Sequence, residues 1–324
     1  MDERPVFNPG SELQRGEFLP PPTPPPLLSQ AALHTLIRQG WIPLTLPTHL
    51  NTHTAALFSE LKAYFALPTA SKRNIYPPKP GTEWGHYAIP SEKQFLTLRC
   101  TVHPDSTLES TAEQVWRDAA TLLHRILCDV ARESDLPCSV WDDMLDGTLS
   151  LPSDEADVSG TLLRMFEYEP EAGYAGEHTD LGLLTLCVGT RPGLECLDME
   201  ASVKQGMEIW VEPEGPVVLV GQTLRGLSEG GINAGVHRVR ATKEGRLSVV
   251  FALRHGWRKE VDLGWFGGEG KVKPRELYER LKVGVVNVNA TTRVRDNQRA
   301  ELEKLRAKEA AEQEQIRKAT VGMG

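Results

Sequence analysis

Residues 161–188 read TLLRMFEYEPEAGYAGEHTDLGLLTLCV, two short apolar runs on either side of a segment rich in turn residues. The same spacing continues to residue 254. The later apolar runs are GLECLD, EIWVEP, PVVLVG, AGVHRVRA and RLSVVFALR. Short apolar runs at this spacing, each bounded by turn residues, predict an antiparallel barrel or sandwich.

Helices are expected on both sides of these strands. Before them, apolar residues recur at helical spacing from Ser29 to Gly40, from Thr48 to Pro68 and over 110–132, where Ser110 and Glu113 form a capping box. Residues 76–90, rich in proline, glycine and aromatics, are expected to form a loop, and 294–319 a solvated helix. We predict four parts: a proline-rich irregular arm (1–28), an N-terminal helical region (29–150), a β core (151–260) and a C-terminal helical tail (261–324).

This order makes the chain an α+β protein with helices and strands segregated. Alternating helices and strands would indicate a parallel nucleotide-binding sheet instead. The sequence contains neither a G-x-G-x-x-G motif nor a P-loop. A dinucleotide or nucleotide fold is therefore not expected.

Composition argues against several classes of partner. The formal net charge is -8 and the pI is about 5.7, so a basic footprint for nucleic acid or for an anionic membrane is lacking. We see no signal peptide and no run of roughly 18 apolar residues. The five cysteines form no C-x-x-C and are expected to be reduced thiols of a cytoplasmic protein, the alternative being a local bridge between Cys187 and Cys196.

A candidate metal site lies in the middle of the predicted β region. His178 and Asp180 are two residues apart, so in a strand their side chains point to the same face. His237 follows 57 residues later in another predicted strand and can supply a third ligand. Two histidines and one carboxylate form the facial triad of non-haem Fe(II) oxygenases, which leaves coordination positions open. An H-x-D pair alone is a weak signal, because most strand histidines are packing residues.

Two further features strengthen this hypothesis. Arg246 and Ser248 share one face of the strand RLSVVFAL, and a buried guanidinium needs an anion, which an acidic co-substrate can provide. The alternative is a structural salt bridge to a protein carboxylate. Tyr168, ten residues before His178, has a phenol that can donate to a bound carboxylate, although a strand tyrosine alone usually serves packing.

In combination, these residues resemble the isopenicillin-N-synthase-like branch of the 2-oxoglutarate/Fe(II) dioxygenases. The resemblance covers roughly residues 30–258, and it is weaker in the N-terminal part, where FALPTASK is similar to the family's Phe-x-Leu-Pro…Lys pattern. The motifs that carry it are Tyr168…Pro170, His178-x-Asp180, Gly193-Leu194, Trp210, Gly221, His237-Arg238-Val239 and Arg246-x-Ser248.

The resemblance implies a double-stranded β-helix, or jelly-roll, core. It implies that His178, Asp180 and His237 bind iron, and that Arg246 and Ser248, assisted by Tyr168, hold the distal carboxylate of 2-oxoglutarate. The expected reaction consumes O2 and 2-oxoglutarate, is stimulated by ascorbate, and hydroxylates, desaturates or cyclises a small organic molecule, as in secondary metabolism. Oligomeric state is left open.

The sequence departs from the family at one loop, where Gly221-Gln222 and Ser228-Glu229-Gly230-Gly231 replace the usual Gly-Asp and Ser-Asn-Gly. We expect a reshaped pocket there rather than loss of iron. Two other functions stay open: an oxidase of the same fold that uses O2 without 2-oxoglutarate, and a non-catalytic jelly-roll binding protein. The pocket candidates are Trp84, His86, Tyr87, Lys93, Arg99, Arg254 and His255, of which Lys93, Arg99 and Arg254 could pair with an acidic substrate.

Overall fold

The computed structural model describes residues 24–79, 82, 84–282, 286–304 and 307. A seven-stranded sheet runs in the order β1-β9-β6-β11-β4-β3-β2, and a four-stranded sheet runs β5-β10-β7-β8. Every strand pairing is antiparallel. The strands of the larger sheet are β1 (Trp41–Pro43), β2 (Gly85–Ile89), β3 (Lys93–Leu98), β4 (Leu162–Tyr168), β6 (Leu184–Gly189), β9 (Val217–Val220) and β11 (Arg246–Leu253).

The smaller sheet completes a jelly-roll core, as the sequence predicted. Its strands are β5 (Ala175–His178), β7 (Leu194–Leu197), β8 (Trp210–Val211) and β10 (His237–Val239). A separate hairpin of β12 (Val261–Asp262) and β13 (Lys271–Val272) precedes the last labelled helix. The helices are α1 (Gln30–Gln39), α2 (Thr48–Phe65), α3 (Thr69–Ile75), α4 (Thr107–Glu133), α5 (Met199–Gln205), α6 (Gln222–Leu227) and α7 (Pro274–Lys282), with short 3-10 turns η1 (Cys138–Trp141), η2 (Glu155–Asp157) and η3 (Leu263–Phe266).

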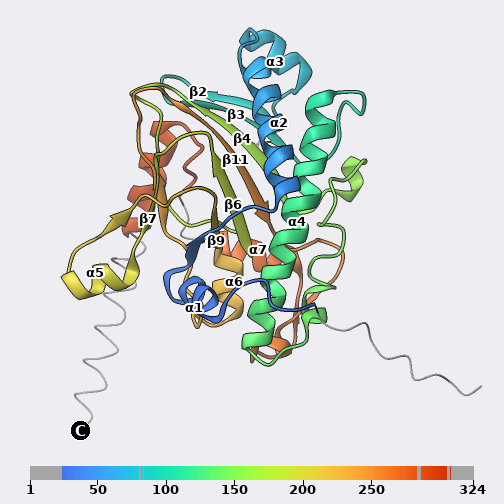
Figure 1. Ribbon diagram of the computed structural model, residues 1–324, viewed down its shortest axis with the longest axis vertical. Coiled ribbons are helices and arrows are strands. Elements are labelled where there is room, and N and C mark those ends of the chain that lie inside the picture. The colour runs from blue at the N-terminus through green and yellow to red at the C-terminus, as the bar shows by residue number, and fades with distance from the viewer. Residues whose placement is uncertain (1–23, 80–81, 83, 283–285, 305–306, 308–324) are drawn as a thin grey trace, which may run out of the picture.

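Helices α2 and α4 lie side by side along one face of the larger sheet (Figure 1). The apolar stripe of α4 is buried there, and the ring of Trp116 meets Phe251 of β11 at 5.2 Å between centroids. Side chains in a strand alternate between faces. In β11, Leu247, Val249 and Phe251 therefore pack against the helical layer, while Arg246 and Ser248 point to the other face. The site lies on that second face.

One predicted helix start was wrong, and the cap that Thr48 was expected to give another helix does not form. Helix α4 begins at Thr107 and not near Ser110, because Ser106 and Glu109 form the same S-x-x-E pattern one turn earlier. Ser106 accepts from the Glu109 backbone N–H, while the buried Glu109 carboxylate accepts from the backbone N–H groups of residues 102 and 103. Helix α2 begins at Thr48, but Pro47 is its N-cap and no side chain caps it.

The predicted loop 76–90 is only partly a loop. Its last residues form β2, which pairs with β3 over Gly85–Ile89. The pairing partner lies in a different segment, so local composition could not reveal it. His86 is consequently a buried strand residue that contacts Gln94, and not a loop residue.

The predicted helical tail, 261–324, opens with the β12–β13 hairpin before α7. Residues 292–304 are helical and mostly exposed, although Arg295 is buried. The rest of the helix predicted to reach residue 319 lies outside the described residues, except for residue 307. So does most of the proline-rich arm. Its described end packs on α4, where Asp129 accepts from the backbone N–H groups of Leu27 and Leu28.

The prediction of five reduced cysteines was wrong for two of them. Cys128 and Cys138 form a disulfide, because the chain reverses after α4 and brings their Cα atoms to 4.7 Å. Cys100, Cys187 and Cys196 are free and buried, so the alternative bridge between Cys187 and Cys196 does not form. In the part of the chain that the structure describes, no helix has both the length and the apolar character needed to cross a bilayer.

Candidate metal and 2-oxoglutarate site

His178 and His237 face each other across neighbouring strands. They are register partners in the pairing of β5 with β10, and their ring centroids are 4.1 Å apart. Asp180 follows two residues after the end of β5. One ligand atom from each of the three residues lies within 4.8 Å of the others. The structure therefore brings together the three residues that the sequence proposed as a metal site.

Both histidine rings are held with one nitrogen directed away from the backbone. Nδ1 of His178 lies 2.8 Å from the carbonyl oxygen of Gly176, and Nδ1 of His237 lies 3.0 Å from that of Gly235. A carbonyl oxygen only accepts, so each Nδ1 carries the proton and donates. With Nδ1 as the donor, Nε2 is the nitrogen of each ring that can offer a lone pair to a divalent metal.

The charges in the cluster also suit a cation. Burial, reinforced by the neighbouring His237 ring, lowers the pKa of His178 to about 3, so the ring is neutral at physiological pH. Burial opposes ionisation of Asp180, but the two imidazoles outweigh it and lower the pKa of that carboxyl. Oδ2 of Asp180 is buried without a hydrogen-bond partner among the described residues. A buried carboxylate oxygen in this state fits a metal ligand.

Arg246 and Tyr168 face the same cavity from the larger sheet. They are register partners in β11 and β4, and both are buried. Nε and Nη1 of Arg246 have no hydrogen-bond partner within the described chain. Gly189 makes room for this guanidinium, since a Cβ there would lie 2.0 Å from Nη2. The structural alternative, a salt bridge from Arg246 to a protein carboxylate, is not seen among the described residues.

These features fit an acidic co-substrate. Burial lowers the pKa of the Arg246 guanidinium from its ordinary value, which reflects the cost of a desolvated charge that an anion would offset. Burial raises the pKa of Tyr168, so its phenol stays protonated and can donate. Ser248 lines the same cavity, and its hydroxyl, which makes only a long 3.3 Å contact to the Val188 carbonyl, can rotate to donate to a carboxylate instead.

The cavity between the sheets has a volume of about 790 Å³, within the range of pockets for small ligands. Tyr87, Arg99 and Arg254 line it, as the sequence suggested. The other pocket candidates do not. Trp84, His86 and His255 are buried in the packing, and Lys93 donates to the backbone carbonyls of Tyr174 and Val288.

Three contributions were missed by the sequence reasoning. Arg164 lines the cavity, and its place on the Tyr168 face of β4 was readable from strand alternation. Gln222, noted only as a departure, donates from Nε2 to the Thr179 hydroxyl at 2.7 Å and from its backbone N to the Asp180 carbonyl. The segment 286–298 closes part of the cavity, and no local signal in the sequence indicated this.

Comparison with known proteins agrees with this architecture. No family model matches the sequence, and no curated protein matches it. Among solved structures, a 2OG-Fe(II) oxygenase family protein from Caulobacter crescentus is 19% identical with a TM-score of 0.62, covering 78% of this chain and 92% of that one. A full-length Neurospora crassa protein, solved in complex with alpha-KG and 5-formyluracil, is 19% identical with a TM-score of 0.59, covering 78% and 89%.

A third neighbour is JOX2, solved in complex with 2OG, Fe and JA. It is 14% identical with a TM-score of 0.59, and the match covers 82% of this chain and 83% of that one. At these identities the likeness establishes the fold. This protein therefore has the fold of the 2OG-Fe(II) oxygenases, with a His-Asp-His cluster in the interior of its jelly roll.

Proposed function

We propose that the protein is an Fe(II)- and 2-oxoglutarate-dependent dioxygenase that oxidises a small organic molecule. The observation that carries this proposal is that one cavity contains both the His-Asp-His cluster and the buried guanidinium of Arg246. His178, Asp180 and His237 offer two Nε2 lone pairs and a carboxylate oxygen. The chemistry that an Fe(II) ion would supply there is activation of O2 at the expense of 2-oxoglutarate, which leaves as succinate and CO2.

Other residues of this chain would bind the co-substrate and exclude water. Arg246 would bind the distal carboxylate of 2-oxoglutarate with its planar fork, and Ser248 and Tyr168 would add hydrogen bonds. The apolar walls of the jelly roll and the segment 286–298 would exclude water from the cavity. That the Neurospora crassa neighbour and JOX2 were solved with small organic ligands supports a substrate of this size. A role in secondary metabolism and a cytoplasmic location stay predictions.

We further propose that the substrate is anionic. Five basic side chains line the cavity, against Asp180 and Glu279: Arg99, Arg164, Arg246, Arg254 and Lys282. Arg254 directly follows the end of β11, six residues after Ser248, a separation of about 20 Å along an extended chain. Arg99 follows the end of β3 at that side, since Leu98 pairs with Leu163, and Arg164 pairs with Val250, midway between Arg246 and Arg254. These three arginines would hold a carboxylate far from the one bound by Arg246.

The test of the dioxygenase is succinate formation by the purified protein with Fe(II), 2-oxoglutarate, O2 and ascorbate. We expect slow succinate formation without added substrate, increased by ascorbate and absent in a His237→Ala control. Iron binding without succinate formation would favour an oxidase that does not use 2-oxoglutarate. Absence of iron binding would favour a non-catalytic jelly-roll protein.

The test of the anionic substrate uses the same assay with small alicyclic and aromatic carboxylic acids and their methyl esters. We expect the acids to stimulate succinate formation more than the esters do. Arg254→Gln is expected to reduce that preference. Stimulation by the esters equal to that by the acids would rule out a carboxylate subsite.

A further inference from the structure

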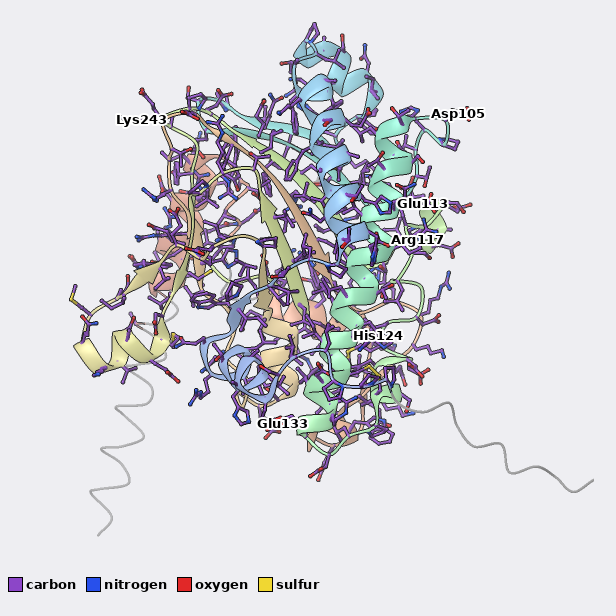
Figure 2. All side chains as sticks on the ribbon, in the orientation of Figure 1. Asp105, Glu113, Arg117, His124, Glu133 and Lys243 are labelled. Atoms are coloured by element: carbon purple, nitrogen blue, oxygen red, sulfur yellow. A yellow bond between two sulfur atoms is a disulfide. The ribbon has the colours of Figure 1, made fainter. Side chains whose placement is uncertain are left out.

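A second cluster of metal-binding side chains lies on the far side of the larger sheet from the cavity. His124 and Cys128 are four residues apart in α4, so both project from one face of that helix. Cys138, at the start of η1, lies against them. One ligand atom from each residue lies within 4.8 Å of the others. Figure 2 shows sulfur atoms near the labelled His124, at the end of α4 nearer Glu133.

The fold holds Cys138 in this place through the turn that follows α4. The turn includes Asp135, which has a positive φ of 55°, and closes with a 2.8 Å bond from the Leu136 N–H to the Ala131 carbonyl. The buried Trp141 then donates from Nε1 to the Leu127 carbonyl at 2.8 Å, which ties η1 to α4. Cys128 and Cys138 are therefore neighbours because of main-chain packing, whether or not their sulfurs are bonded.

We propose that His124, Cys128 and Cys138 form a redox-controlled site for one zinc-class divalent cation. In the structure the two sulfurs are joined as a disulfide, which is the oxidised, metal-free state of the site. In the reduced state, two thiolates and one imidazole are a donor set that Zn²⁺ prefers.

The geometry of the nitrogen and sulfur donors suits a tetrahedral ion. Nε2 of His124 lies 3.8 Å from Sγ of Cys128. For a tetrahedral Zn²⁺ the usual bond lengths place N and S donors about 3.6 Å apart.

The surroundings of the cluster attract cations. Between residues 129 and 146 the chain carries six carboxylates and one arginine. One of these carboxylates, Asp142, lies close enough to His124 for its charge to act on the ring. A water molecule would take the fourth position of the ion. His124 and Cys138 are only partly buried, so the site is open to solvent and to small reagents.

The redox step is a two-electron exchange. A thiol or phosphine reductant supplies two electrons, two protons are taken up, and the Cys128–Cys138 bond becomes two thiols. Binding of the divalent cation then releases both thiol protons. In the reverse direction a peroxide accepts two electrons from the thiolates, takes two protons from solvent and leaves as two waters, while the sulfurs rejoin and the cation departs.

The test uses Co²⁺ as a coloured substitute for zinc on the full-length protein. After reduction with a phosphine and removal of the reductant, Co²⁺ is titrated and the thiolate-to-cobalt charge-transfer band is recorded. This band requires sulfur ligands, so Co²⁺ bound by His178, Asp180 and His237 cannot produce it. We expect one equivalent of cobalt to give the band in reduced protein and none in peroxide-treated protein.

Substitutions show which residues give rise to the charge-transfer band. Cys138→Ser and Cys128→Ser are expected to lose it, and His124→Ala to shift the d–d spectrum. Cys100→Ser, a buried cysteine elsewhere, and His237→Ala are expected to keep it. Should the cysteine variants fail to fold, release of Zn²⁺ from reduced wild-type protein by peroxide, followed with a metallochromic indicator, gives a second measurement. Two new reactive thiols without a band, or a band that survives Cys138→Ser, would overturn the proposal.

Discussion

At the scale of single residues, both histidines of the candidate metal cluster are held by the same kind of backbone hydrogen bond. In each, Nδ1 donates to the carbonyl oxygen of the glycine two residues earlier, Gly176 or Gly235. The bond fixes the tautomer and the ring plane before any metal arrives. The two histidines are thus preorganised by the backbone of β5 and by the loop before β10.

The role of Arg246 can be tested by separating its charge from its shape. Arg246→Met removes both, and we expect the KM for 2-oxoglutarate to rise about 10–100-fold, since a charge-assisted contact contributes about 1.5–3 kcal/mol. Arg246→Lys keeps the charge but not the planar fork, so its KM should lie between those of the wild type and Arg246→Met. Steady-state succinate kinetics measure both. An unchanged KM in Arg246→Met, with iron still bound, would contradict the assigned role.

Gln222 is expected to position the metal ligands without touching the metal. Its Nε2 bond to Thr179 and its backbone bond to Asp180 hold the turn that carries the carboxylate. In Gln222→Ala we expect iron to bind about tenfold more weakly, as for other groups that orient metal ligands. Gln222→Glu, which can accept from the Thr179 hydroxyl, should retain most of the affinity. Competition with a chelator measures this, and equal affinities in all three proteins would refute it.

At the scale of elements, β11 contributes one face to the hydrophobic core and the other to the cavity. Its odd-numbered side chains, such as Phe251, pack against α4, and its even-numbered ones, such as Arg246, face the cavity. A shift of register by one residue would exchange the two sets. The packing of α4 on β11 therefore keeps Arg246 directed toward the cavity.

Trp116 is the central contact between α4 and β11, and its truncation should be costly. The side chain is fully buried, lies against Phe251 and donates from Nε1 to the Thr148 carbonyl at 3.0 Å. We expect Trp116→Ala to lower the free energy of unfolding by about 3–5 kcal/mol and Trp116→Phe to lower it less. Thr121→Ala, on the exposed face of the same helix, is the matched control. Urea denaturation gives the values, and a loss below that of the control would contradict the packing argument.

At the scale of the whole molecule, the cavity is completed by a segment far from it in the sequence. Residues 286–298 line one side of the cavity, and Arg295 anchors them by a buried ion pair to Glu92, in the turn between β2 and β3. Lys93 adds a bond from Nζ to the Val288 carbonyl at 3.0 Å. The segment 286–298, called the cover below, is thus fixed to the edge of the larger sheet by two adjacent residues, Glu92 and Lys93.

Breaking the ion pair should open the cover without unfolding the jelly roll. Removal of one partner of a buried pair costs about 3–5 kcal/mol, because the other charge is left unpaired. In Glu92→Gln we therefore expect faster hydrogen exchange over 286–304, while β4 and β11 stay protected. Glu279→Gln, an exposed carboxylate on the same cavity, is the control. Unchanged exchange in 286–304 would show that other contacts hold the cover.

The same pair makes the cover sensitive to acid. Burial alone would raise the pKa of Glu92, but its bonds from Arg295 and Thr292 outweigh burial and hold it below its ordinary value of 4.5. A lowered pKa means that the pair stabilises the closed cover above pH 4.5 and that this contribution is lost as the pH falls through the lower folded value. We expect exchange over 286–304 in wild-type protein to approach that of Glu92→Gln only below pH 4.5. A difference between the two proteins that does not change with pH would contradict this.

The sequence by itself determined the features that depend on short-range periodicity. The alternation of β4 and β11, the i and i+2 placement of Arg246 with Ser248, and the helical stripe of α4 all follow from the geometry of a single element. The same rule paired His178 with Asp180, although β5 ends at His178 and Asp180 lies in the turn that follows. For the same reason, an antiparallel barrel or sandwich could be predicted from the strand spacing, and the resemblance to a known family narrowed this to a jelly roll. His237, 57 residues later in another predicted strand, could only be proposed as a third ligand, and the resemblance to a known family implied that the three residues bind one metal.

Only the tertiary structure decided which distant segments meet. It placed β2 beside β3, Gln222 beneath the turn of Asp180, the 286–298 segment over the cavity, and Cys138 against Cys128 and His124. None of these contacts can be read from the hydrophobic periodicity of the sequence. Each joins two distant segments, and the periodicity of either segment does not depend on the other. Their free energy comes from burying surface and pairing polar groups across the whole fold, and that depends on where the chain has already packed.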